Sequence, residues 1–240
     1  MKYSIILPYY NRPSIQFTLT SFHHHYADRN DYEVIILEDS KTDPIYKKLL
    51  QDFIDLWKDK INISYHFYNN PAWIQTKVMN GGALLAKGKF IILTSSECMH
   101  YTNILKGLDE EFDQDENKYV ICSCMNINPI ENFEPSMENV VSTGWLQHSE
   151  FGNRQFHFCS SISRDNFHGM GGFDEQYAKG VWYDDDDFIK KIKQVKFPIV
   201  PRDDLIAAHI AHDRVYQIQD GGNLIFRNLA YYKMKWGCEP

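Results

Sequence analysis

A run of four adjacent aspartates, Asp184–Asp187, is the strongest local candidate for chemistry in this sequence. Adjacent carboxylates repel one another, and folding tolerates that repulsion more readily where cations or ligand hydroxyl groups engage them. A carboxylate in such a run can also act as a general base. The structural alternative is that the four acids open a helix, where the helix dipole stabilises negative charge.

Polar and acidic side chains also recur where predicted strands end. Tyr9–Asn11 follow the first strand, Glu38–Asp39 the second and Ser96–Glu97 the fourth. The carboxyl ends of parallel strands meet at one edge of an open sheet, where the ligand crevice forms. A single acid at a strand end is often only a helix cap, but three such clusters favour a ligand site. The sequence has no glycine-rich dinucleotide or P-loop motif, which disfavours those two nucleotide-binding classes.

The elements that would position these residues alternate along the first half of the chain. Apolar, β-branched runs predict strands over residues 3–7, 33–37, 61–68, 90–93 and 119–124. Helical spacing or capping predicts helices over residues 14–25, 45–58, 76–86 and 103–112. This order predicts an α/β fold with a single doubly wound, mostly parallel sheet flanked by helices.

The second half is less regular. Residues 126–154 predict a long, irregular excursion, after which order returns over residues 156–163 and a helix begins at Asp184. One or two helices are predicted over residues 217–235. We therefore divide the chain into a half at 1–125, a second half of the same domain at 126–215 and a helical tail at 216–240.

Composition narrows the class of protein further. The net charge of -7 argues against a protein that grips nucleic-acid backbone non-specifically. The five cysteines show no paired metal-ligand spacing, and an odd count without a disulfide framework fits a reducing compartment. The N-terminal apolar run is too short for a signal peptide, and no segment reaches the roughly 18 apolar residues of a membrane helix. We expect a cytoplasmic protein whose membrane contact, if any, is peripheral.

Several segments together resemble the family 2 glycosyltransferases of the GT-A type. The matching segments are SIILPYYNR at 4–12, EVIILEDSKTD at 33–43, MNGGALLAKG at 79–88, GGFDE at 171–175 and WYDDDDF at 182–188. The GGFDE turn and the acidic run that follows it also resemble the acceptor motif of galactosyltransferases. Each segment alone is weak, but the ordered set is fairly specific.

The resemblance implies a nucleotide-sugar site at the strand ends. Tyr10 and Asp39 would lie at the uracil or its equivalent, and a carboxylate there can accept a hydrogen bond from a base N–H. Lys77 and Asn80 would lie near the ribose or diphosphate, although Lys77 also fits a solvated helix face. The full set implied for the nucleotide is Pro8, Tyr9, Tyr10, Asn11, Glu38, Asp39, Lys77, Asn80 and Ser96.

The sequence departs from the family at the fourth strand end, where the family usually carries a metal-binding D-x-D. Residues 94–97 here are TSSE, so only Glu97 supplies a carboxylate. One carboxylate can suffice for Mn²⁺ or Mg²⁺ when diphosphate and water complete the coordination shell. His209 or His212 could add an imidazole, as a C-terminal histidine does in related enzymes, and Mn²⁺ accepts nitrogen better than Mg²⁺ does. The alternative is that both histidines are core or loop residues.

Alignment of the acidic run with the family motif puts Asp185 at the general base. Asp184 or Asp187 would bind acceptor hydroxyls or orient the loop, and Trp182 would stack on a sugar face. The resemblance thus implies transfer of a sugar, most often from a UDP-sugar, to a hydroxyl of a glycan or other acceptor, with inversion at the anomeric carbon. A nucleic-acid acceptor stays open. The alternatives are a non-catalytic or metal-independent nucleotide-sugar-binding module and a sugar-phosphate nucleotidyltransferase.

Overall fold

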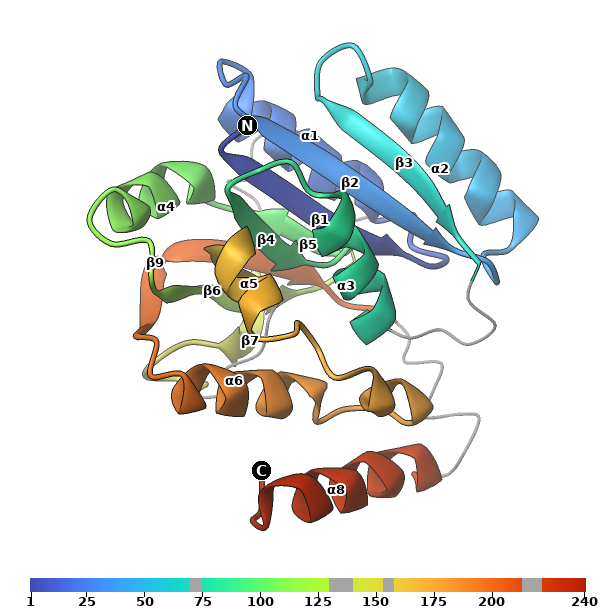
Figure 1. The fold of residues 1–240 in the computed structure, drawn as a ribbon. Helices are drawn as coiled ribbons and strands as arrows, with labels where there is room; N and C mark the ends of the chain where they lie inside the picture. The colour runs from blue at the N-terminus through green and yellow to red at the C-terminus, as the bar shows by residue number, and fades with distance from the viewer. Residues whose placement is uncertain (70–74, 130–139, 153–157, 213–221) are drawn as a thin grey trace.

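The computed structural model describes residues 1–69, 75–129, 140–152, 158–212 and 222–240. Its centre is a curved nine-stranded sheet with the order β3-β2-β1-β4-β8-β6-β9-β5, and β7 pairs with β6 (Figure 1). The strands are β1 Tyr3–Tyr9, β2 Tyr32–Asp39, β3 Ile63–Tyr68, β4 Phe90–Thr94, β5 Cys98–His100, β6 Tyr119–Ile127, β7 Ser142–Gln147, β8 Cys159–Ser163 and β9 Ile199–Ile210. The helices are α1 Ile15–Tyr26, α2 Pro44–Trp57, α3 Gln75–Leu85, α4 Ile104–Phe112, α5 Arg164–Gly169, α6 Asp184–Gln194 and α8 Asn223–Trp236, with a short 3-10 helix, η2, at Glu175–Lys179.

The α/β class and the elements predicted for the first half are confirmed. Strands β3, β2, β1 and β4 run parallel, and each connection between them contains a helix. The prediction of a mostly parallel sheet needs one correction. Strand β8 inserts between β4 and β6 and runs antiparallel to both, so the second half of the sheet is mixed. An antiparallel pair, unlike a parallel one, needs no crossover connection.

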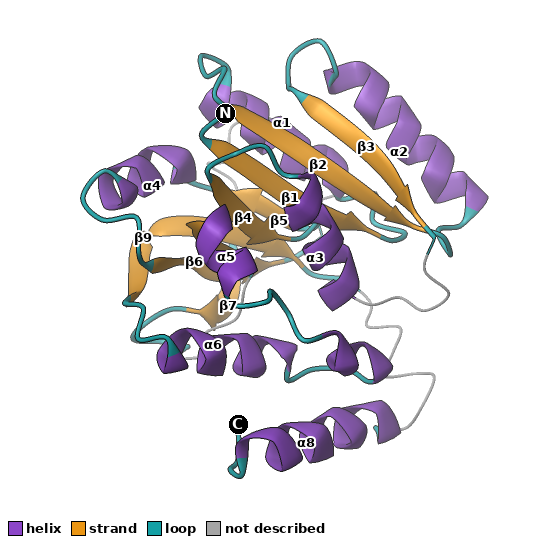
Figure 2. Ribbon diagram, viewed as in Figure 1, coloured by secondary structure: helices purple, strands orange, loops and turns teal. Residues whose placement is uncertain are grey.

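Helices cover both faces of the sheet, giving three layers (Figure 2). On one face α1, α2 and α4 contribute the buried side chains of Phe22, Leu50 and Leu108 to a common core. On the other face α3, α5 and α6 contribute Met79, Phe167 and Phe188. Strands β1 and β2 are buried along their whole length, which explains the apolar runs Ile5–Leu7 and Val34–Leu37 within them.

Three strands, β5, β7 and β9, were missed by the sequence patterns. Strand β5 has only three residues, and β9 contains Pro201 and the polar residues Arg202–Asp204. Strand β9 nevertheless pairs with β6 on one side and β5 on the other. The pairing of β9 with β6 has a register shift at the polar segment. Cys122 pairs with Arg202, whereas the next residue, Ser123, pairs with Ile206, so the residues between Arg202 and Ile206 have no pairing partner on β6.

The C-terminal helix packs outside the sheet layers. Helix α8 runs beside η2 and the start of α6, at the end of the molecule opposite the N-terminus (Figure 1). This confirms a helix in the predicted tail, although residues 217–221 of the tail lie outside the described residues. Residues 130–139 and 153–154 of the predicted excursion also lie outside them, and β7 forms within the described part of that excursion. Among the helices that the structure describes, none has the length and apolar character to cross a membrane.

Candidate active site

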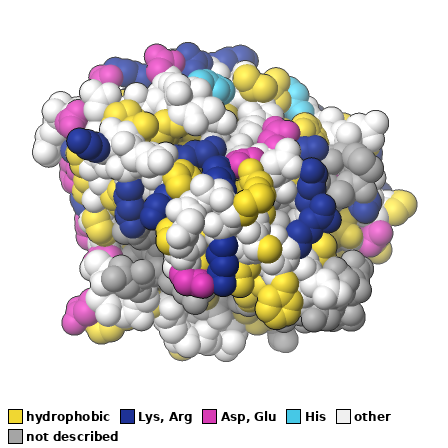
Figure 3. Space-filling view, turned by 60° about the horizontal axis from the view of Figure 1, so that its bottom comes forward, with side chains coloured by type: hydrophobic (Ala, Val, Ile, Leu, Met, Phe, Trp, Pro, Cys, Tyr) yellow, Lys and Arg dark blue, Asp and Glu magenta, His cyan; other side chains and the backbone are white. Residues whose placement is uncertain are grey.

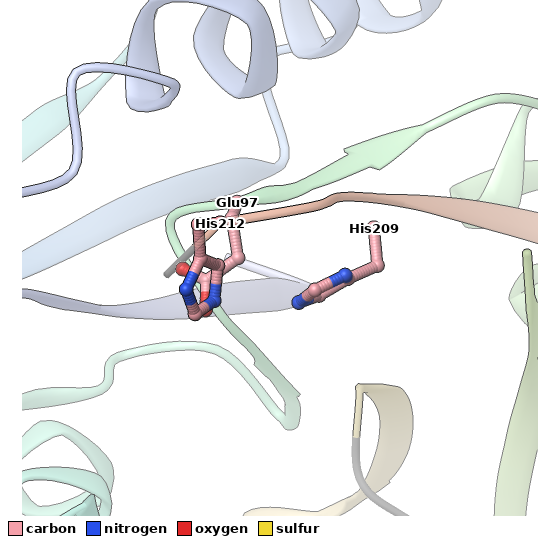
Figure 4. A group of neighbouring side chains, drawn as sticks. All are labelled: Glu97, His209 and His212. Atoms are coloured by element: carbon pink, nitrogen blue, oxygen red, sulfur yellow. The ribbon is translucent and has the colours of Figure 1, made fainter. Parts of the chain in front are cut away.

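Glu97, His209 and His212 come together at one edge of the sheet (Figure 4). Glu97 lies in the turn between β4 and β5, His209 is near the end of β9, and His212 follows two residues after that strand. One potential ligand atom from each of the three side chains lies within 4.8 Å of the other two. The sequence analysis expected Glu97 at a metal site, with His209 or His212 as a further ligand. In the structure all three side chains lie together.

Main-chain hydrogen bonds join the segments that carry Glu97 and His209. The amide of Ile210 donates a hydrogen bond of 2.9 Å to the carbonyl of Glu97, and Cys98 pairs with His209 across β5 and β9. His212 Nε2 lies 3.2 Å from Glu97 Oε1, and the two imidazole ring centres are 5.3 Å apart. One carboxylate oxygen and two imidazole nitrogens form a donor set suited to a divalent transition metal.

Arg12 is a neighbour of this cluster that the sequence analysis did not assign. Its Nε lies 3.9 Å from Glu97 Oε2, and each of the two side chains is 16% exposed. Burial by itself would raise the pKa of Glu97, but the hydrogen bond from His212 and the charge of Arg12 outweigh it, so the pKa is lowered. Glu97 is therefore a carboxylate at neutral pH. The signal for Arg12 was its place directly after the YYN segment.

Asp39 ends β2 at the predicted nucleotide edge and is almost fully buried. Its Oδ1 accepts a hydrogen bond of 2.8 Å from the amide of Lys41, whereas Oδ2 is buried without a hydrogen-bond partner. Burial raises the pKa of this carboxyl, and the backbone amide and charge of Lys41 offset only part of that effect. A buried acceptor without a donor is costly in a folded protein and is available to a ligand N–H.

Other residues predicted for the nucleotide are occupied by structural hydrogen bonds. The hydroxyl of Tyr9 is buried and donates to the carbonyl of Tyr46 at 2.9 Å. Glu38 is also buried, where it accepts a hydrogen bond from the hydroxyl of Tyr65. The side chain of Ser96 donates to the carbonyl of Pro8, and so joins β1 to the turn that carries Glu97.

The loops after β1 and β2 are joined by Asn11. Its Nδ2 donates to Asp43 Oδ2 and its Oδ1 accepts from the amide of Asp43, both at 2.9 Å. Asn11 has a positive φ of 48°, which asparagine tolerates better than most residues. Tyr10 and Lys77 are half-buried, the first directly after β1 and the second on α3.

The side-chain amide of Asn80, predicted near the ribose or diphosphate, holds the GGFDE turn. Its Oδ1 accepts from the amide of Phe173 at 2.9 Å, and its Nδ2 donates to the Phe173 carbonyl at 3.0 Å and to Glu175 at 3.3 Å. A Cβ at Gly172, where φ is 61°, would come within 2.5 Å of Asn80 Oδ1. Glycine is thus required by both the backbone angle and the contact.

The acidic run begins α6, as predicted. Trp182 and Tyr183 both have positive φ, which turns the chain sharply into the helix, and the Trp182 side chain is exposed. Asp184 and Asp185 are half-buried.

Asp185 lies near the buried phenol of Tyr119, whose pKa is raised first by burial and further by that charge. The Tyr119 hydroxyl bonds to Ser160, which pairs with Leu93 one residue before the end of β4. Helix α6 therefore starts near the strand end that leads to Glu97.

Asp187 is placed differently from its neighbours, in an arrangement closer to the expected alternative of orienting the loop than to contact with acceptor hydroxyls. Its side chain is fully buried beneath α8. Lys235 Nζ lies 2.6 Å from Asp187 Oδ1, Trp236 Nε1 donates to the same oxygen at 2.8 Å, and Lys191 Nζ lies 3.8 Å from Oδ2. Asp187 thus anchors the C-terminal helix in this structure.

Lys235 also pairs with Asp174 of the GGFDE turn at 2.7 Å, which links that turn to the acidic helix. Figure 3 turns the α8 end toward the viewer and shows lysine and arginine side chains spread among hydrophobic ones. The negative charge of the whole chain is therefore not uniform over its surface.

A three-layer α/β fold with acids at the strand ends is typical of domains that bind a ligand at that edge, and comparison with known proteins gives the class. The model of glycosyl transferase family 2 matches residues 4–191, and the chain belongs to that family. None of the curated proteins matches this sequence significantly.

Solved structures share the fold at low sequence identity. TarS from S. aureus in complex with UDP-GlcNAc has a TM-score of 0.69 and 15% identity over 92% of this chain and 61% of its own. GalNAc-T7 with UDP, GalNAc and Mn²⁺ has a TM-score of 0.71 and 15% identity over 89% of this chain and 44% of its own. The mannosyltransferase PcManGT from Pyrobaculum calidifontis with GDP-Man and Mn²⁺ has a TM-score of 0.67 and 14% identity over all of this chain and 66% of its own. The chain thus spans 44–66% of the length of these three neighbours.

Proposed function

We propose that this protein is a glycosyltransferase that moves a sugar from a nucleotide-sugar, with a UDP-sugar as the first choice, to a hydroxyl of a glycan or other acceptor. The observation that carries the proposal is the convergence of Glu97, His209 and His212 at the sheet edge of a family 2 domain. The family match favours glycosyl transfer over the alternative of nucleotidyl transfer.

The three side chains would hold a divalent cation. Two imidazoles and one carboxylate favour Mn²⁺ over Mg²⁺, which prefers oxygen ligands. A cation bound there would offset the negative charge that develops on the diphosphate leaving group. Two fold neighbours were solved with Mn²⁺, which supports this choice of metal. Arg12, on the other side of Glu97, is a second cation within reach of a diphosphate at this edge.

Asp39 would accept a hydrogen bond from the nucleotide base through its unpartnered Oδ2. Both uracil and guanine carry a ring N–H, so this contact alone does not select the nucleotide. Among the fold neighbours, TarS was solved with UDP-GlcNAc and PcManGT with GDP-Man. We favour UDP because it is the commonest donor nucleotide among the relatives that the sequence resembles.

Asp185 would be the general base. It would remove the proton of the acceptor hydroxyl as that oxygen attacks the anomeric carbon from the face opposite the nucleotide. This displacement would invert the anomeric configuration. Exposed Trp182 would offer a stacking surface for the acceptor sugar, and half-buried Asp184 would accept hydrogen bonds from its hydroxyls.

The proposal is tested first by titration calorimetry with UDP, with and without Mn²⁺, and then by a panel of nucleotide-sugars scored by released nucleotide. We expect UDP binding that strengthens with Mn²⁺ and turnover of at least one donor. The variant Glu97→Ala should lose the dependence on Mn²⁺, whereas Glu239→Ala, which removes an exposed acid on the C-terminal segment, should keep it. Equal affinity with and without metal would remove Glu97 from a metal site. Nucleotide binding without turnover of any donor would instead support the non-catalytic module.

A further inference from the structure

The imidazole of His209 forms a hydrogen bond with the side chain of an asparagine. Its Nδ1 lies 3.0 Å from Oδ1 of Asn126, and the two residues are direct partners across β6 and β9. A neutral imidazole has one N–H and one nitrogen lone pair, and its partners decide which nitrogen carries the proton. If the amide oxygen faces Nδ1, that nitrogen must carry the hydrogen and Nε2 keeps the lone pair.

Thr143 on β7 fixes the orientation of the Asn126 amide. Its hydroxyl donates to the main-chain carbonyl of Asn126 at 3.1 Å. Since that hydroxyl has a single proton, its oxygen can only accept from the Asn126 side chain, and Asn126 Nδ2 lies 2.9 Å away. The amide nitrogen therefore faces Thr143 and the amide oxygen faces His209.

The ring of His209 points its far side toward Glu97 and His212 (Figure 4). The ring of Phe158 packs edge-on against the ring of His209, with 5.5 Å between centroids. The imidazole is thus held by an aromatic contact and by a hydrogen bond to Nδ1.

We propose that Asn126 is a positioning residue that holds His209 in its Nδ1–H form, so that Nε2 is presented to a divalent cation bound by Glu97 and His212. Thr143 maintains this arrangement by fixing the asparagine amide. The cation rests on the proposed function, whereas the protonation of His209 does not. Neighbouring strands β7, β6 and β9 carry the chain of hydrogen bonds, so the sheet itself sets the direction of the ligand.

The first test reads the histidine directly, without metal. Two-bond ¹H–¹⁵N correlation spectra of the ¹⁵N-labelled protein, above the pH at which His209 is charged, report which ring nitrogen is protonated. We expect the Nδ1–H form for His209 in the wild type and a mixture of the two forms in Asn126→Ala. An Nε2–H form in the wild type would overturn the proposal.

The second test measures Mn²⁺ affinity by electron paramagnetic resonance in the presence of UDP. Loss of a residue that orients a metal-bound histidine typically costs about 10–100-fold in metal affinity, and we expect a loss in that range for Asn126→Ala. Asn126→Asp keeps an acceptor for the Nδ1 proton and should retain affinity within a few-fold. Asn117→Ala, which removes a side-chain amide that accepts a hydrogen bond from Asn166, is the control and should match the wild type.

The outcomes separate the two proposals. If the wild type binds Mn²⁺ and Asn126→Ala binds it equally well, the positioning role is wrong and the proposed metal site stands. If the wild type binds no Mn²⁺ with UDP present, the metal part of both proposals fails. Circular dichroism of each variant checks the fold, and Asn126→Asp keeps the test decisive if Asn126→Ala does not fold.

Discussion

Each half of this protein buries an aspartate whose Oδ2 has no hydrogen-bond partner, but the charges around the two differ. Asp187 on α6 is surrounded by Lys235, Lys191 and the indole of Trp236. Asp39 at the end of β2 receives one backbone hydrogen bond, and its second oxygen has no hydrogen-bond partner. Both belong to segments that resemble functional motifs, so sequence alone gave them similar weight.

The surroundings of a buried acid indicate whether it serves the fold or can bind a ligand. A buried carboxylate that is neutralised by lysines within its own fold has little left to offer a ligand, and removing a partner leaves an unpaired charge. A buried carboxylate with an orphan oxygen makes the free protein less stable and gains a partner when a ligand supplies one. Because two lysines lie beside Asp187, whereas the hydrogen bond to Asp39 comes from a main-chain amide, we propose Asp39 as a ligand contact and Asp187 as an anchor.

The largest effect should come from Asp185→Asn, which keeps the size of the side chain but removes the base. We expect a loss of about 10²–10⁴-fold in turnover, because that is the usual contribution of a general base, and nearly unchanged nucleotide affinity. Turnover is measured as released nucleotide with the donor found in the panel. The neighbouring Asp186→Asn is the matched control and should cost far less. Unchanged turnover in Asp185→Asn would refute its assignment as the base.

The next largest effect should come from Lys235→Ala, which leaves Asp187 buried beside the more distant Lys191. We expect a loss of about 3 kcal/mol in the free energy of unfolding, as for other buried pairs that lose one partner. Lys233→Ala, on the same helix but paired with exposed Glu239, should cost less than about 1 kcal/mol. Urea unfolding followed by tryptophan fluorescence measures both. Similar losses in the two variants would show that Asp187 does not depend on α8.

The smallest effect, and one of opposite sign, should come from Asp39→Asn. Burial raises the pKa of Asp39, so protonation favours the folded state and that stability is lost as the pH rises through the folded-state pKa. At neutral pH the ionised side chain is thus destabilising. We expect Asp39→Asn to raise stability by about 1 kcal/mol, or about 2–4 °C in Tm, and to weaken nucleotide binding by about 10-fold.

The pH dependence gives this prediction a second check. The gain in Tm from Asp39→Asn should shrink as the pH falls toward 3.8, the ordinary value for aspartate, because the wild-type carboxyl is then protonated as well. Thermal melts of both proteins across this pH range measure it. A variant that is less stable than the wild type at neutral pH would mean that Asp39 already has an internal partner.

The alternating half of the fold could be predicted because its elements follow local rules. Strand β2 is an apolar run buried on both faces, and α2 begins with Pro44 after Asp43, a common helix start. Strand β9 could not be predicted in this way, because the polar segment around Arg202 leaves no continuous pattern. That segment is accommodated by pairing with β6 from another part of the chain, which no local window contains.

The candidate site shows the same limit, because residue types can be read from the sequence but contacts between distant segments cannot. The residue types at Glu97, His209 and His212 pointed to metal chemistry, but more than 100 residues separate the first from the others and only the sheet joins them. The roles of Tyr9, Glu38 and Asn80 could not be read from residue type, because each is decided by which hydrogen-bond partner the fold supplies. Asn126 carried no signal, because the sequence pattern placed it in the irregular excursion rather than in the strand that β6 forms.

The main-chain hydrogen bond from Ile210 to Glu97 has a consequence for the thermodynamics of ligand binding. It spans the two segments that supply the site, so their separation is already determined in the free protein. A donor that binds there does not have to bring two mobile loops together, and the entropy lost on binding is confined to the ligand and a few side chains. Affinity at this edge should therefore respond strongly to the identity of the side chains and weakly to changes in loop length elsewhere.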